Sequence, residues 1–187
     1  MRDFTQHKYT QLLNALIEQE YHFQTFNEYL TAPKSRSIIL RHDVDKLPKN
    51  SLALAKIESE LGLKGVYYFR AKACSWDETI IKEIAKLDHE VGYHYEDLST
   101  HKGNHQDAFQ SFKQNLERLR KLVPVSTICM HGSPTSRYDS RDLWDHYRYQ
   151  DLKLKGEPYF DTDFSKVLYL TESGMATRSA SGIKLIR

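Results

Sequence analysis

The sequence has little of several features that define large protein classes. Its two cysteines, Cys74 and Cys129, stand far apart without CxxC spacing, which favours two reduced thiols, although one disulfide is also compatible with them. Apolar runs all fall short of the ~20 residues that span a bilayer. The N-terminus lacks the apolar core of a signal peptide. These absences predict a cytoplasmic protein without a membrane span.

An excess of charge of one sign is also lacking. Basic and acidic residues number 27 and 25, and no basic block stands out, so we expect no nucleic-acid partner. A chain of 187 residues, 40% hydrophobic and 28% charged, fits one ordinary globular domain. We expect one domain over residues 1–187, either complete or shortened at its C-terminal end. Histidine, by contrast, is plentiful: the nine imidazoles are candidate metal ligands and proton carriers.

Strand-like and helix-like segments alternate along most of the chain. Apolar periodicity predicts helices over 5–18, 48–61, 75–87 and 104–123, the third opened by a capping box of Ser75 with Glu78. Between them, β-rich runs predict strands at 37–45, 66–69, 91–95 and 126–130. This order predicts an α/β fold with a parallel sheet. Further along, the pattern predicts a short helix at 141–149 and short strands at 157–160 and 167–170.

Three polar clusters follow predicted strands. They are Arg41-His42-Asp43-Val44-Asp45, Tyr93-His94-Tyr95-Glu96-Asp97 and Met130-His131-Gly132-Ser133-Pro134. In parallel sheets and barrels, sites lie at the C-terminal ends of the strands. The clusters are therefore expected to converge on one site.

The first cluster supplies two carboxylates that can take different roles at one site. With Val44 between them, Asp43 and Asp45 fall on one face of an extended chain. One carboxylate can bind a cation while the other serves as a base. The alternative is a turn or helix-capping role for Asp45 ahead of Pro48.

The second and third clusters supply histidines. His94 with Glu96 offers donors that suit a cation such as zinc, whereas Asp97 is better explained as the start of the next helix. His131 precedes a glycine and a proline, as in a shaped functional loop. A satisfied structural histidine is the alternative for it. The remaining histidines of this region are interpreted as solvated, with His101 the strongest exception: His89, His101, His105 and His146.

These clusters resemble the motifs of a known family, the polysaccharide deacetylase (NodB-homology, carbohydrate esterase 4-like) superfamily. Residues 41–45 look like its first motif, His89-Glu90-Val91-Gly92-Tyr93-His94 like its second, and residues 131–134 take the place of its third. The stretches 129–134 and 156–160 look like a divergent, uncharacterised bacterial subgroup. The resemblance implies a distorted or incomplete (β/α) barrel; we count about six strands against the eight of a complete barrel.

The resemblance also implies roles for individual residues. Asp43 takes the position of the catalytic base, and Asp45 and His94 take those of metal ligands, with zinc as the expected divalent metal. The family's second metal histidine lies four residues beyond the first, where this chain has Leu98. Three side chains are candidates for the missing ligand: Glu96, His101 and His131.

The expected activity is metal-dependent removal of an acyl (acetyl) group from an N-acylated sugar or a related amide. His131 would donate a proton to the leaving amine. The expected substrate contacts come from Tyr95, Ser133 and Arg141. No further cofactor is expected. The alternatives are a catalytically inactive carbohydrate-binding protein on the same fold and a hydrolase of small non-sugar amides.

Overall fold

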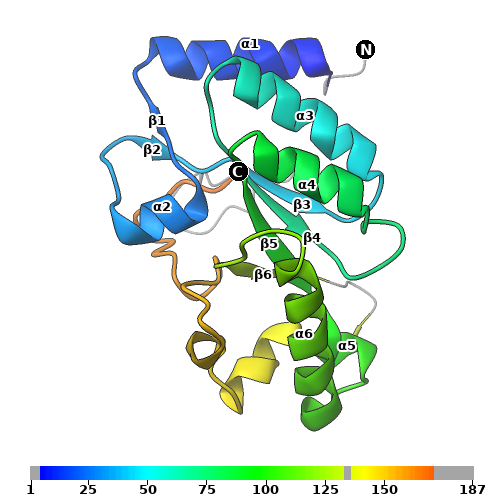
Figure 1. The fold of residues 1–187 in the computed structure, drawn as a ribbon. Coiled ribbons are helices and arrows are strands. Elements are labelled where there is room, and N and C mark those ends of the chain that lie inside the picture. The colour runs from blue at the N-terminus through cyan, green and yellow to red at the C-terminus, as the bar shows by residue number, and fades with distance from the viewer. Residues whose placement is uncertain (1–4, 133–135, 171–187) are drawn as a thin grey trace.

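The chain folds around a four-stranded parallel sheet, as a computed structural model that describes residues 5–132 and 136–170 shows (Figure 1). Strands β3 (Arg41–Val44), β4 (Val66–Phe69), β5 (Glu90–Tyr95) and β6 (Ile128–Met130) lie in that order, each parallel to its neighbour. The sheet curls into a half-barrel with covering helices. The predicted α/β fold with a parallel-stranded, incomplete barrel is therefore confirmed.

The helices occupy the links between these strands and the two ends of the described chain. Among the described residues, none of them is both long and apolar enough to cross a membrane. A separate two-stranded sheet pairs β1 (His22–Phe23) with β2 (Ser37–Ile38). The helices are α1 (Gln6–Glu18), α2 (Phe26–Thr31), α3 (Pro48–Glu60), α4 (Glu78–Lys86), α5 (Asp97–Thr100) and α6 (His105–Arg120), followed by the 3₁₀ helices η1 (Ser140–Asp145) and η2 (Tyr149–Leu152).

Local sequence signals explain where several helices begin and end. The side chain of Asn104 caps α6 by accepting a hydrogen bond from the Asp107 amide. Pro48 stands in the first turn of α3, where a missing N–H costs nothing. Gly62 follows that helix with a φ of +71°, a conformation that glycine adopts without strain. These signals confirm the predicted helix at 48–61 and the predicted start of α6.

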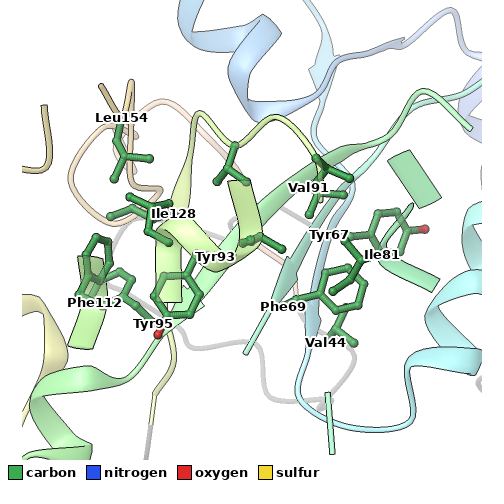
Figure 2. Packing of buried hydrophobic residues seen from close by; sticks show 14 of the residues in the cluster. Val44, Tyr67, Phe69, Ile81, Val91, Tyr93, Tyr95, Phe112, Ile128 and Leu154 are labelled. Carbon is green, nitrogen blue, oxygen red and sulfur yellow. The ribbon is translucent and has the colours of Figure 1, made fainter. Parts of the chain in front are cut away.

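The two faces of the sheet bury different residues. On one face, alternate strand residues such as Tyr67, Val91 and Tyr93 pack against α3, α4 and α6 in the main hydrophobic core (Figure 2). On the opposite face, Tyr68 and Cys129 pack against α2 and the segment that carries Tyr159 and Tyr169. Because strand side chains alternate between faces, this second face also receives Asp43 and His94.

Several local predictions are wrong: the expected strand at 167–170 does not form among the described residues, and side-chain contacts replace three further local patterns. Asp77, not Ser75, caps α4, since the Ser75 hydroxyl instead donates to the Val44 carbonyl and ties that helix to β3. Residues 157–160 form a turn rather than a strand, because the Glu157 carboxylate accepts the amides of Tyr159 and Phe160.

The third of these side-chain contacts is made by His89. It was expected to be solvated, yet it is only 5% exposed. Its Nδ1 accepts the Gly65 amide at 3.0 Å, and its Nε2 lies 2.8 Å from the Ala55 carbonyl, to which it must donate. The imidazole therefore joins α3 to the sheet as a neutral ring.

Candidate metal centre

The C-terminal ends of three strands bring the predicted site residues together. Asp43 lies in β3 and Asp45 directly follows it; His94 lies in β5, and His131 follows β6. The His131 amide donates to the Tyr95 carbonyl at 2.9 Å, which extends the β5–β6 pairing by one residue. The convergence expected from the three clusters is thus built from hydrogen-bonded strands rather than from free loops.

Asp45, His94 and His131 form a compact group of three donors. One ligand atom from each lies within 4.8 Å of the others. The Asp45 Oδ1 atom is 2.9 Å from His131 Nδ1 and 3.7 Å from His94 Nε2, and the two ring nitrogens are 3.3 Å apart. Two imidazoles and one carboxylate at this spacing suit a cation such as zinc.

His94 is held in the tautomer that a metal ligand needs. Its Nδ1 lies 2.9 Å from the Cys129 carbonyl, and because a carbonyl only accepts, the proton sits on Nδ1. The lone pair of Nε2 then faces Asp45 and His131. Burial lowers the pKa of His94, so the ring is neutral. A metal-ligating histidine usually donates the N–H of its other ring nitrogen to a backbone carbonyl or a similar acceptor.

Buried carboxylate oxygens support a cation at this position. Oδ1 of Asp43 is buried without a hydrogen bond among the described residues, and the equally buried Oδ1 of Asp45 has a His131 ring nitrogen 2.9 Å away. Burial opposes ionisation of Asp45, yet contact with His131 and the charge of Arg70 lower its pKa. An ionised oxygen that is buried and lacks a donor is costly unless a cation compensates it. The residues present therefore fit a divalent metal.

A second set of potential donors shares His94 with the first. It consists of Asp43, His94 and Cys129. Burial raises the pKa of the Cys129 thiol well above its ordinary value, so the sulfur stays protonated. Because the thiolate, not the thiol, binds metals, this set is the poorer ligand group.

Asp43 is fixed by Arg41, its neighbour on the same face of β3. Arg41 Nη2 donates to Asp43 Oδ2 at 2.9 Å and reaches the hydroxyls of Tyr159 and Tyr169 at 3.4 and 3.1 Å. The guanidinium also lies over both tyrosine rings. Asp43 Oδ2 is 4.0 Å from His94 Nε2, so the carboxylate stands beside the donor group. The sequence places Arg41 in the first cluster, but its tyrosine partners come from distant segments.

Glu96 lies apart from the metal donors. Its two oxygens accept Nε and Nη2 of Arg70 at 2.8 and 2.9 Å, and no described donor group includes it. Leu98 does not approach the centre either, because it is 2% exposed within the main core. Of the three candidates for the missing ligand, the structure brings His131 into the group. His101 caps the end of α5.

The three expected substrate contacts are placed differently. Tyr95 is fully buried, and its hydroxyl accepts the Trp144 indole N–H at 2.9 Å, so it is a core residue. Arg141 forks onto Asp139 and lies over the Tyr159 ring. Ser133 lies outside the described residues.

A groove opens beside His131, one of the three donors. It continues along the chain toward Asp139, the partner of Arg141. Its described lining consists of Met130, His131, Gly132, Ser136, Arg137, Tyr138 and Asp139.

Comparison with known proteins shows a likeness in fold to a solved structure. No protein-family model and no curated protein matches the sequence. Among solved structures, the chain is similar to a Streptococcus pyogenes deacetylase, PplD, in complex with acetate. The TM-score is 0.53 at 16% sequence identity, over 79% of this chain and 69% of the other. This likeness shows a deacetylase-like fold and confirms that part of the predicted resemblance.

Proposed function

We propose that this protein is a metal-dependent hydrolase that removes an acyl group, typically acetyl, from an N-acylated sugar or a related amide. The observation that carries the proposal is the group of Asp45, His94 and His131, with an unpaired carboxylate oxygen of Asp43 beside it. The deacetylase-like fold supports the same reaction class, as does the acetate in complex with the similar Streptococcus deacetylase.

Asp45, His94 and His131 would hold the metal. Zinc in such a site polarises the acyl carbonyl and lowers the pKa of a bound water. The hydrogen bond from His94 to the Cys129 carbonyl keeps one ligand oriented. The end of β6 positions the other, because the Met130 amide donates to the buried Glu157 carboxylate at 2.9 Å.

We assign the proton transfer to Asp43. Its Oδ1 has no described hydrogen-bond partner and can take a proton from the attacking water, while Oδ2 stays tied to Arg41. The fixed guanidinium keeps the carboxylate from rotating toward solvent, to which 27% of its side chain is exposed. The protonated Asp43 can then deliver that proton to the leaving nitrogen.

This assignment changes the expected role of His131. As a proton donor, the imidazole would need to face the substrate, whereas its Nδ1 faces Asp45 and His94. We therefore propose His131, rather than Glu96, as the third metal ligand.

The metal assignment is tested by zinc content. The wild type and single alanine variants of Asp45, His94 and His131 would be loaded with zinc, desalted and measured by mass spectrometry. We expect about one zinc per chain in the wild type and strong loss in each variant, with Glu96→Gln retaining zinc. His22→Ala, an exposed histidine on β1, is the matched control. Equal zinc in all the proteins would contradict the assignment.

The activity is tested by acetate release. N-acetylated monosaccharides, oligosaccharides, nucleotide sugars and simple amides would be screened with the zinc-loaded protein. Release from sugars supports the proposed function, and release from simple amides alone supports the small-amide alternative. Sugar binding that survives Asp43→Asn, without acetate release from any substrate, would identify a binding protein instead.

A further inference from the structure

We propose that Arg70 binds the acyl oxygen that becomes negatively charged during hydrolysis at this centre. By the same contact it would bind the carboxylate product. The inference rests on the proposed function and adds a residue that the sequence motifs do not identify. Arg70 directly follows β4, the strand that lies between those carrying Asp43 and His94. Its side chain thus starts at the same end of the sheet as the metal donors.

The guanidinium is held rigidly by Glu96. Nε and Nη2 of Arg70 donate to the two carboxylate oxygens in a fork, at 2.8 and 2.9 Å. The Arg70 amide is also fixed, because it donates to the Ser75 hydroxyl at 3.0 Å. A forked arginine–carboxylate pair sets both position and orientation. Glu96 thereby acts as a positioning residue.

The remaining guanidinium nitrogen, Nη1, does not take part in the fork with Glu96. Within the described part of the chain, Nη1 has no hydrogen bond; it lies 3.8 Å from Asp45 Oδ1, too far for one. Asp45 belongs to the donor group, so the free N–H groups of Nη1 border the centre. The Arg70 side chain is 18% exposed and the Asp45 side chain 47%, so a ligand can reach the space between them from solvent.

Two other arginines of this region are already engaged. Arg41 donates to Asp43 and two tyrosines, and Arg141 is forked onto Asp139. Arg70 therefore has the N–H groups best placed to bind an anionic oxygen beside the metal donors. A guanidinium that is oriented before the ligand arrives binds an oxyanion without further reorganisation.

The reaction creates such an oxygen. Hydrolysis breaks the acyl C–N bond and forms a C–O bond from the water oxygen. Asp43 takes one water proton and passes it to the leaving nitrogen; the second water proton goes to the released amine, so the products are a carboxylate and an ammonium group. Negative charge grows on the acyl oxygen during this step and remains on the carboxylate product. Arg70 Nη1 would bind that charge, which makes Arg70 a catalytic residue that touches the substrate.

The test is acetate affinity, measured by isothermal titration with the zinc-loaded protein. We expect Arg70→Gln to weaken acetate binding ~10-fold or more and Arg70→Lys to weaken it less, because lysine keeps the charge but loses the fork. Arg118→Gln, on the exposed side of α6, is the matched control and should bind acetate like the wild type. Zinc content should stay unchanged in all four proteins.

Two results would overturn the proposal. One is wild-type acetate affinity in both Arg70 variants, and the other is zinc loss in them, which would make Arg70 a support of the metal site. Failure of the proposed function would be seen in the wild type instead, which would then bind no zinc or release no acetate from any substrate. The acetate affinities of metal-free wild type and Arg70→Gln would still decide the role of Arg70.

Discussion

Gly92 is the position where one added methyl group should disturb both the sheet and the metal centre. It lies in β5, two residues before His94 and on the same face of the strand. A Cβ at this position would lie 2.8 Å from the Thr127 carbonyl and closer still to two ring carbons of Tyr68. Tyr68 cannot move aside, because it is fully buried and its hydroxyl bonds Thr127 Oγ1 at 3.2 Å.

The expected cost of Gly92→Ala follows from this overlap. Overpacking of a buried site costs about 1–3 kcal/mol. At about 2–4 °C per kcal/mol for a chain of this size, the melting temperature should fall by about 2–12 °C. Displacement of β5 should also weaken zinc binding through His94. Thermal unfolding followed by circular dichroism and zinc titration measure the two effects.

Gly132→Ala is the matched control, because a Cβ there meets no atom within 4 Å. A double variant sharpens the test: Tyr68→Leu makes room for the new methyl group. Gly92→Ala with Tyr68→Leu should therefore be more stable than the sum of the two single changes predicts. Equal melting temperatures for Gly92→Ala and Gly132→Ala would refute the packing argument.

Three further predictions address the base, the pH dependence and the missing ligand. Asp43→Asn should lower kcat by about 10²–10⁴ with unchanged zinc content, in an acetate-release assay; loss of zinc instead would make Asp43 a ligand. Burial lowers the pKa of His89 from 6.5, so the folded state resists the proton that the unfolded state accepts. Stability should therefore fall as pH drops through 6.5, by up to about 1.4 kcal/mol at pH 5.5, in denaturant titrations; an identical pH slope in His89→Gln would contradict this. Leu98→His should destabilise the core by about 1–3 kcal/mol, because it buries a polar ring without a partner. It should not raise zinc affinity, because Leu98 packs in the main core and not at the centre; tighter zinc binding in the variant would contradict this.

The strands and the convergence of the site were predictable because both depend on local pattern. Apolar runs ending in polar clusters located β3, β5 and β6, and parallel topology then required their ends to meet. Capping chemistry located the start of α6 at Asn104. No side-chain partner had to be known for any of these conclusions.

The partners of individual polar residues were not predictable, because they come from distant segments. Glu96 had the spacing of a ligand, but Arg70, at the end of another strand, binds both of its oxygens. Ser75 and Glu78 had the spacing of a capping box, but the Val44 carbonyl competes for the hydroxyl. The local sequence of His89 does not differ from that of a surface histidine, because its hydrogen-bond partners Gly65 and Ala55 come from other segments.

The contacts of Arg41 also bear on the order of folding. Arg41 reaches Tyr159 and Tyr169, which are 118 and 128 residues further along the chain. Contacts of such long sequence separation close late, because the entropy of a large loop must be lost first. During synthesis, β3 and its carboxylates emerge well before the segment that immobilises Arg41. The proposed activity should therefore appear after the sheet has formed, and refolding followed by acetate release should lag behind refolding followed by circular dichroism.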